Sequence, residues 1–197
     1  MRRTMLLLTA MAAVLVMASG VALAVARSGG PGDDTLRGTN GTDALTGNGG
    51  DDDLLGIRGT DALSGGDGRD AVLGGTERGP RAGDRALSGG PDRDFVGGGK
   101  GSDALSGGGG GDFMFAGPPF GEEADDVDAI AAGDGKDAIL AKNEPAAKDV
   151  IDCGGGFDRI LVDGKDVTND CEREFTSPRE FFRSIGGEGY FVPLNSL

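Results

Sequence analysis

Residues 29–73 are GGPGDDTLR GTNGTDALT GNGGDDDLL GIRGTDALS GGDGRDAVL, five consecutive copies of one nine-residue unit. Every copy begins with Gly, has Asp at its sixth position and has Leu or Val at its eighth. Three more copies, GGPDRDFVG, GGKGSDALS and GGGGGDFMF, fill residues 89–115. Self-similarity at a fixed period is typical of solenoids, in which each repeat forms one unit and stacks on its neighbours.

Looser copies continue the pattern beyond Pro119. They keep an Asp two residues before an Ile, at Asp128, Asp137, Asp149 and Asp158, with spacings of nine, twelve and nine residues. A linker of solvated charges has no reason to hold Asp and an apolar residue in fixed phase over this length. We therefore favour a folded repeat array over a flexible Gly/Asp-rich linker, which is the alternative interpretation.

The unit resembles the nonapeptide G-G-x-G-x-D-x-U-x of the hemolysin-type calcium-binding (repeats-in-toxin) family, where U is a bulky apolar residue. The resemblance covers roughly residues 29–161 and implies an all-β fold, a parallel β-roll or β-solenoid, here with a short C-terminal cap. We expect the first six positions to form a turn and the last three a short strand whose middle residue points into a narrow core. The resemblance also implies that each ion lies between two neighbouring turns and takes one Asp from each turn, together with turn carbonyls.

Calcium suits these turns because it takes six to eight oxygen ligands from carboxylates and carbonyls. We expect Gly at positions one, two and four to allow positive φ and to aim carbonyls at a common point. Turns eighteen residues apart should share an edge, so that Asp34 faces Asp52. The predicted carboxylate ligands are Asp34, Asp43, Asp52, Asp61, Asp70, Asp94, Asp103, Asp112, Asp128, Asp137, Asp149 and Asp158. The predicted carbonyl turns are at Gly29, Gly32, Gly47, Gly65, Gly98 and Gly107.

Composition supports cations as the partners. The formal net charge is -14, with 33 acidic against 19 basic residues, which disfavours nucleic acid because its phosphates need a basic surface. Glycine makes up 40 of the 197 residues, and ordering Gly costs more backbone entropy than ordering any other residue. Without calcium we expect stacked carboxylates and this entropy to leave the chain largely disordered. A solenoid that needs no calcium is the alternative.

The N-terminus has the features of an export signal. Arg2 and Arg3 precede an uncharged, mostly apolar run, and Ala22-Leu23-Ala24 matches a cleavage site. We expect cleavage near Ala24-Val25 and secretion; an uncleaved membrane anchor is the alternative. No long membrane-active segment follows, so we expect no membrane insertion of the mature chain. Our division of the chain is 1–24 signal, 25–28 lead, 29–115 regular roll, 116–161 irregular repeats with an insert, and 162–197 cap.

Two cysteines fit an oxidising compartment. We expect Cys153 and Cys171 to form one disulfide at the end of the roll, rather than a metal site. The aromatic segment after it is expected to cover the open core, since solenoids need terminal caps, or else to dock another protein.

The pattern departs from regularity in two places. The copy before Leu87 is stretched and has Arg85 at its sixth position, either as a built-in cation that replaces an ion or as a simple bulge. The insert at 116–127 contains Glu122, Glu123, Asp125 and Asp126, which we interpret as a solvated charge run rather than a further ion site.

Enzymatic chemistry has little support in the residues. The chain has no His, which removes Ser/His/Asp and Cys/His systems and HExxH zinc sites. We therefore expect a secreted, non-enzymatic calcium-binding protein. The alternatives are an extracellular adhesin or matrix module that binds cell-surface polysaccharide or protein, with calcium only structural, and an accessory module of a secreted hydrolase or toxin.

Overall fold

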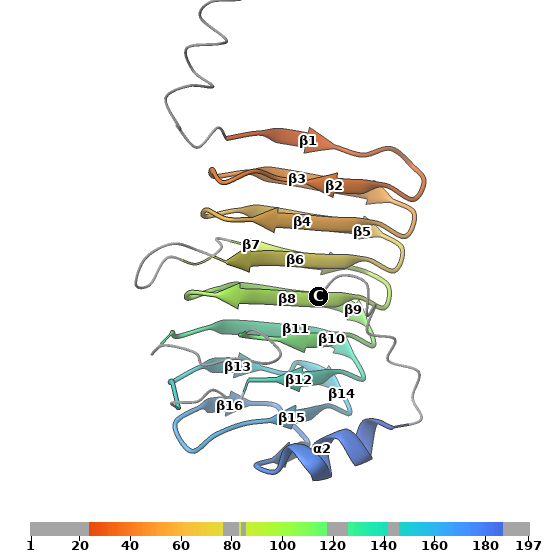
Figure 1. Cartoon of the computed structure of the whole chain (residues 1–197). Helices are drawn as coiled ribbons and strands as arrows, with labels where there is room; N and C mark the ends of the chain where they lie inside the picture. Colours follow the sequence, from red (N-terminus) through yellow and green to blue (C-terminus); the bar gives the residue numbers. More distant parts are fainter. Residues whose placement is uncertain (1–23, 77–82, 84–85, 118–125, 142–145, 187–197) are drawn as a thin grey trace, which may run out of the picture.

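The computed structural model describes residues 24–76, 83, 86–117, 126–141 and 146–186. In these residues the chain winds through a stack of parallel coils, each of which contributes one strand to either side (Figure 1). The first sheet has the strand order β1-β3-β5-β7-β9-β11-β13-β16, with β14 beside β11, and the second has the order β17-β15-β12-β10-β8-β6-β4-β2. The parallel β-roll predicted from the repeats is confirmed.

The strands of the first sheet are β1 (Ala26–Ser28), β3 (Ala44–Gly49), β5 (Ala62–Asp67), β7 (Ala86–Gly90), β9 (Ala104–Gly110), β11 (Ala129–Gly135), β13 (Val150–Asp152), β14 (Gly155–Gly156) and β16 (Val167–Asn169). Those of the second sheet are β2 (Thr35–Arg37), β4 (Asp53–Ile57), β6 (Ala71–Thr76), β8 (Phe95–Lys100), β10 (Phe113–Phe115), β12 (Ala138–Leu140), β15 (Arg159–Leu161) and β17 (Arg173–Phe175). One helix, α2 (Pro178–Ile185), follows.

Several strands are longer than the three residues that we expected. β3, for example, begins at the seventh position of one copy and runs to Gly49, the third position of the next. Backbone pairing between coils continues there, because neighbouring copies have the same conformation and can stack in register. The turn proper is therefore confined to positions four to six.

The core is a ladder of the eighth-position side chains. Leu45 pairs in register with Leu63, which pairs with Leu87, and the column continues through Leu105, Ile130 and Ile151. The second sheet supplies Leu54, Val72, Val96, Met114, Ile139 and Ile160 in the same way. All of these side chains are buried, because the period of two in a strand directs every eighth position inward.

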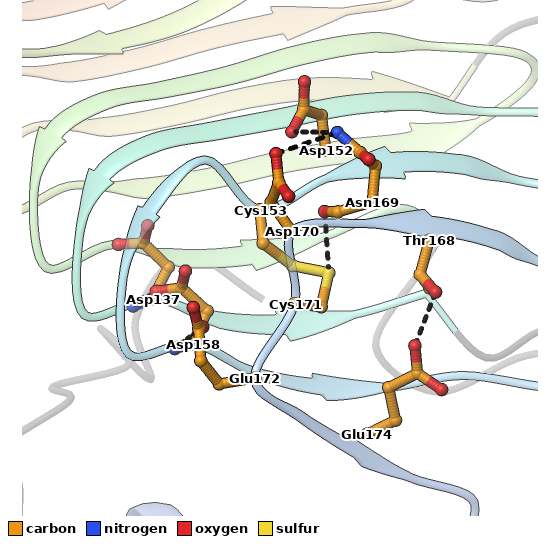
Figure 2. The surroundings of a disulfide bond; sticks show 10 residues. All are labelled: Asp137, Asp152, Cys153, Asp158, Thr168, Asn169, Asp170, Cys171, Glu172 and Glu174. Atoms are coloured by element: carbon orange, nitrogen blue, oxygen red, sulfur yellow. Dashed lines mark hydrogen bonds between the residues drawn. A yellow bond between two sulfur atoms is a disulfide. The ribbon is translucent and has the colours of Figure 1, made fainter.

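Polar residues occupy the core register at both ends of the stack. Arg27 pairs with Leu45 in register, and its guanidinium donates a hydrogen bond to the carbonyl of Arg37, 2.7 Å away. In the last coil Thr168 and Glu174 take the places of the aliphatic residues, and the Thr168 hydroxyl donates to the Glu174 carboxylate (Figure 2). The apolar ladder thus ends in side chains that favour water.

Helix α2 lies at the C-terminal end of the stack (Figure 1). Its buried side chains, Phe181 and Ile185, join Phe113, Phe115 and Phe175 in a second apolar cluster that is separate from the ladder. Phe113 and Phe115 flank the inward-facing Met114, so this cluster lies on the outer face of the second sheet. The described part of the segment that we expected to cap the roll therefore packs on the outer face of the second sheet at the last coils. The strands of the roll continue to Phe175.

Candidate metal centres

The sixth-position aspartates form two columns, one at each edge of the roll. The second-edge column leads into the second sheet and contains Asp34, Asp52, Asp70, Asp94, Asp112, Asp137 and Asp158; the first-edge column leads into the first sheet and contains Asp43, Asp61, Asp103, Asp128 and Asp149. Within a column, the backbone N–H of most of these aspartates donates to Oδ1 of the Asp one coil later. The distance is 2.7 Å from Asp34 to Asp52 and 2.8 Å from Asp94 to Asp112.

This bond repeats along both edges. On the second edge it also joins Asp52 to Asp70, Asp70 to Asp94, Asp112 to Asp137 and Asp137 to Asp158. On the first edge it joins Asp43 to Asp61, Asp103 to Asp128 and Asp128 to Asp149. The structure thus brings together the pairs of aspartates that the eighteen-residue spacing places on one edge.

The other carboxylate oxygen has no protein partner in many of these turns. Oδ2 is buried and accepts no hydrogen bond in Asp52, Asp70, Asp94, Asp112, Asp137, Asp149 and Asp158. A buried carboxylate oxygen without a partner is costly, and it is tolerated where the group is protonated or a cation neutralises it. Buried, unpaired oxygen is therefore a feature that calcium would satisfy.

The glycine at position one lies where a carboxylate oxygen and a carbonyl oxygen converge. In the first two turns that carboxylate oxygen also accepts a backbone hydrogen bond, from the Gly30 N–H to Asp34 and from the Thr39 N–H to Asp43. A β-carbon placed on Gly29 would lie 2.6 Å from Oδ2 of Asp34 and 2.6 Å from the carbonyl oxygen of Gly47, one coil away. On Gly38 it would lie 2.5 Å from Oδ2 of Asp43 and 2.5 Å from the carbonyl oxygen of Gly56. These distances are close to the 2.3–2.6 Å of calcium–oxygen bonds.

The same oxygen pair recurs at other coils. Beside each of these glycines lie an Asp Oδ2 and a carbonyl oxygen. They are Asp52 and Gly65 at Gly47, Asp61 and Gly74 at Gly56, Asp103 and Ala116 at Gly98, and Asp112 and Ala132 at Gly107. We call each such arrangement, an Asp Oδ2 and a carbonyl oxygen from the next coil converging beside a position-one glycine, an oxygen cradle. A hard cation that prefers carboxylate and carbonyl ligands fits it.

The carbonyl set differs from the one expected. Of the glycines predicted to supply carbonyls, Gly47 and Gly65 have their carbonyl oxygens in cradles. Gly29, Gly98 and Gly107 are position-one glycines beside which a cradle lies, and Gly32 is at position four. The carbonyls of Gly56, Gly74, Ala116 and Ala132 were missed. The repeat alignment could have identified these carbonyls, because the residue at position one of each copy is equivalent to that of every other copy.

Positive φ occurs at positions two and four, and the expectation that position one also needs it was wrong. At position four, Gly50 has φ 101° and Gly68 has φ 118°, which brings each turn backbone against the turn before it. Position-one glycines have no positive φ. Their lack of a β-carbon serves the cradle instead.

Burial raises the pKa of several aspartates in both columns. Loss of hydration, with a smaller contribution from neighbouring carboxylates, raises the pKa of Asp94 to about 8 and that of Asp112 to about 7. Burial likewise raises the pKa of Asp149 to about 7, and those of Asp70 and Asp137 to about 6. Near neutral pH Asp94 therefore holds a proton, and Asp112 and Asp149 hold one for part of the time; a divalent cation would displace these protons.

Each column ends on an acidic residue that the repeat pattern did not identify as a site. Asp166 Oδ1 accepts from the Asp149 N–H at 3.2 Å, and Glu172 accepts from the Asp158 N–H at 2.9 Å. Figure 2 shows Asp137, Asp158 and Glu172 close together near one edge of the last coils. Asp166 precedes Val-Thr, a weak form of the Asp-x-apolar signal, whereas Glu172 has no signal in the sequence.

Predictions for the irregular segments have mixed outcomes. Asp126 is buried and accepts a hydrogen bond from the Gly101 N–H at 3.0 Å, so it is not part of a solvated charge run. Glu122, Glu123, Asp125 and Arg85 lie outside the described residues. The described residues contain no group of three His, Cys, Asp or Glu side chains placed to hold a metal, so a site there must include carbonyl ligands.

The expected disulfide is present. It joins Cys153 to Cys171, eighteen residues later (Figure 2). Cys153 is fully buried and lies in the core cluster, and Cys171 packs against it. The last two coils are therefore covalently connected.

The comparison with known families agrees with this geometry. A family model described as the RTX calcium-binding nonapeptide repeat (4 copies) matches residues 28–63 and 87–118. These coils are RTX calcium-binding repeats. No curated protein matches the chain. The RTX assignment implies calcium binding, and the matched segments include the cradles at Gly29, Gly38, Gly47, Gly98 and Gly107.

Among the residues that the structure describes, no helix is long and apolar enough to cross a bilayer. The predicted signal segment falls almost wholly within residues 1–23, outside those residues.

Proposed function

We propose that the chain is a secreted, non-enzymatic calcium-binding β-roll whose RTX coils fold when calcium fills the turns. The oxygen cradles carry this proposal. Each offers a buried carboxylate oxygen and a carbonyl oxygen to one point, and in the turns of Asp52 and Asp112 that carboxylate oxygen has no protein partner. The ligands would be the aspartates of the two columns together with position-one carbonyls of the next coil.

Calcium would supply the positive charge and the coordination that these oxygens lack. The chain's own residues arrange the ligands. The columns of N–H to Oδ1 bonds orient the carboxylates, and the glycines at positions two and four let consecutive turns approach closely. Because the site needs two stacked turns, it does not exist in the unfolded chain. Binding free energy therefore becomes folding free energy.

Secretion is supported by the N-terminal signal pattern, the disulfide and the abundance of free calcium outside cells that such sites would use. The absence of His leaves few catalytic systems for an enzyme to use.

The decisive experiment compares two adjacent aspartates in one coil. Asp52 belongs to the second-edge column and is 1% exposed, whereas Asp53 begins β4 and points to solvent. Calcium titrations of the Asp52→Asn and Asp53→Asn variants are followed by calorimetry and circular dichroism. They distinguish the loss of a calcium ligand from the loss of one negative charge, which both variants share. We expect Asp52→Asn to lower the number of bound ions and raise the calcium midpoint of folding, and Asp53→Asn to match the parent protein.

Magnesium serves as the ion control, because it demands smaller, near-octahedral sites and dehydrates reluctantly. Circular dichroism that is the same in chelator and in millimolar calcium would overturn the proposal.

A further inference from the structure

The residue at position one changes character along the roll. In every copy from residue 29 to residue 115 it is Gly, and in the coils from residue 116 to residue 175, which we call the later coils, it carries a side chain. The later position-one residues are Ala116, Ala132, Ala141, Cys153 and Val162. The family match likewise ends at residue 118.

Backbone hydrogen bonds establish that these residues are equivalent to the earlier glycines. The N–H of Gly38 donates to the carbonyl of Leu55, the ninth-position residue of the next coil on this side, at 2.8 Å. The N–H groups of Ala116, Ala141 and Val162 make the same bond one coil further on, at 3.0, 2.9 and 2.9 Å. The change is therefore one of side chain within an unchanged backbone path.

The side chains of the later position-one residues belong to the core. Ala116, Ala132, Ala141 and Cys153 are fully buried and Val162 nearly so, and all of them lie in the same cluster as the leucine ladder. A β-carbon at this position of the earlier coils would be 2.6 Å or less from both oxygens of the cradle at Gly29, Gly38, Gly47, Gly56, Gly98 and Gly107. A side chain and a cation bound between those oxygens cannot share that space.

The later coils have other sources of stability. The Cys153–Cys171 disulfide joins two of them. The aromatic cluster adds helix α2, whose Phe181 packs edge-on against Phe175 at 5.8 Å between ring centroids. Both contributions are independent of ions.

We propose that the residue at position one decides whether a coil depends on calcium. Glycine creates an oxygen cradle in the regular coils, residues 29–115, whereas the later coils replace the cradle with core side chains and form a calcium-independent base. This inference rests on the proposed function and narrows it: the aspartates of the later coils, including Asp137 and Asp158, serve the hydrogen-bonded column rather than a cradle of this type.

Hydrogen exchange of the full, oxidised chain, measured by mass spectrometry in excess chelator and in millimolar calcium, tests the proposal. In chelator we expect slow exchange in peptides from residues 129–140, 150–161 and 173–185, and rapid exchange in those from 35–73 and 95–113. Calcium should slow exchange of the regular coils by at least about 100-fold, and that of the base by less than about tenfold. Equal calcium dependence in both regions would overturn the inference while leaving calcium-driven folding intact; no calcium dependence in either would overturn the proposed function.

Two opposite substitutions in one column test position one itself. Gly107→Ala adds a β-carbon to a cradle; Gly107 has no positive φ, so its backbone conformation suits alanine, and the new β-carbon displaces the Asp112 carboxylate and the Ala132 carbonyl. We expect it to lower the number of bound ions, measured by calorimetry, while the base keeps its slow exchange. Ala132→Gly, in the next coil, should leave the number of ions unchanged and speed exchange of the base in chelator. An unchanged ion count and affinity in Gly107→Ala, or fewer ions in Ala132→Gly, would refute the role of position one.

Discussion

The regular coils and the later coils have the same backbone path and different sources of stability. Both have parallel strands in register, an apolar ladder and columns of buried aspartates. In the regular coils the space beside position one is bordered by oxygens, and in the later coils it is filled by side chains such as Ala132 and Cys153. If the oxygen cradles bind calcium as we propose, a single position in the repeat exchanges ionic for hydrophobic stabilisation without altering the fold.

Features of the sequence outside position one also explain why the two regions need different sources of stability. The narrow ladder of the regular coils buries one apolar side chain per nine residues, which is too little to offset the entropy of ordering so much glycine. The later coils add position-one side chains, a disulfide and, together with Phe113 and Phe115 of the last regular copy, an outer aromatic cluster. Each addition should therefore matter most when calcium is absent.

The largest expected effect comes from the aromatic cluster. Phe181 is fully buried, whereas the adjacent Phe182 is 48% exposed. Phe181→Ala should destabilise the base by about 3–5 kcal/mol, and Phe182→Ala, the matched control, by much less. Thermal unfolding in chelator, where only the base contributes, measures both. Equal effects of the two variants would show that α2 does not stabilise the later coils.

Removal of the disulfide should have the next largest effect. The double variant Cys153→Ala with Cys171→Ala opens a loop with a sequence separation of 18 residues and should cost about 3 kcal/mol. We expect the loss in chelator, as faster exchange of β13 and β15, while the calcium midpoint of the regular coils changes little. A shift of that midpoint as large as the loss in the base would mean that the two regions fold as one unit.

Much of this fold could be predicted from the repeat, and the reason is physical. A nine-residue period with Asp at position six and an apolar residue at position eight fixes the register of both sheets, so the Leu45 and Leu54 ladders and the two Asp columns follow directly. The roles of position one and of Glu172 did not follow, because they depend on the three-dimensional convergence of oxygens from different coils. The site of α2 packing was also unpredictable, since the outer aromatic residues Phe113 and Phe115 occupy variable positions of the repeat.

Acid should act on the regular coils in two opposite ways. Burial raises the pKa of Asp94 to about 8 and of Asp112 to about 7, above the ordinary 3.8 of an unfolded chain. Between pH 4 and pH 8 the metal-free folded form therefore binds more protons than the unfolded chain, so its stability increases as the pH falls and is lost as the pH rises through about 8.

Calcium must displace the same protons, so its apparent affinity should fall by at least about tenfold between pH 7.5 and pH 5.5. Circular dichroism across this range, with and without chelator, measures both trends. In the base, where Asp137 and Asp149 also have raised pKa values, only the first trend should appear. A calcium midpoint that does not change with pH would contradict displacement of protons from these aspartates.

The smallest expected effect tests backbone strain in the regular coils. Ile57 stands at position two with φ 92°, a conformation that β-branched residues strongly disfavour, and the equivalent Asn48 has φ 88°. Ile57→Gly should stabilise the calcium-loaded roll by about 1 kcal/mol, because glycine adopts this φ without steric cost and the half-buried Ile57 side chain contributes little packing. Asn48→Gly should give a smaller gain, since Asn tolerates positive φ better. Both gains should appear as a lower calcium midpoint, with no change in the hydrogen exchange of the base. A higher midpoint for Ile57→Gly would mean that the packing of this side chain outweighs its strain.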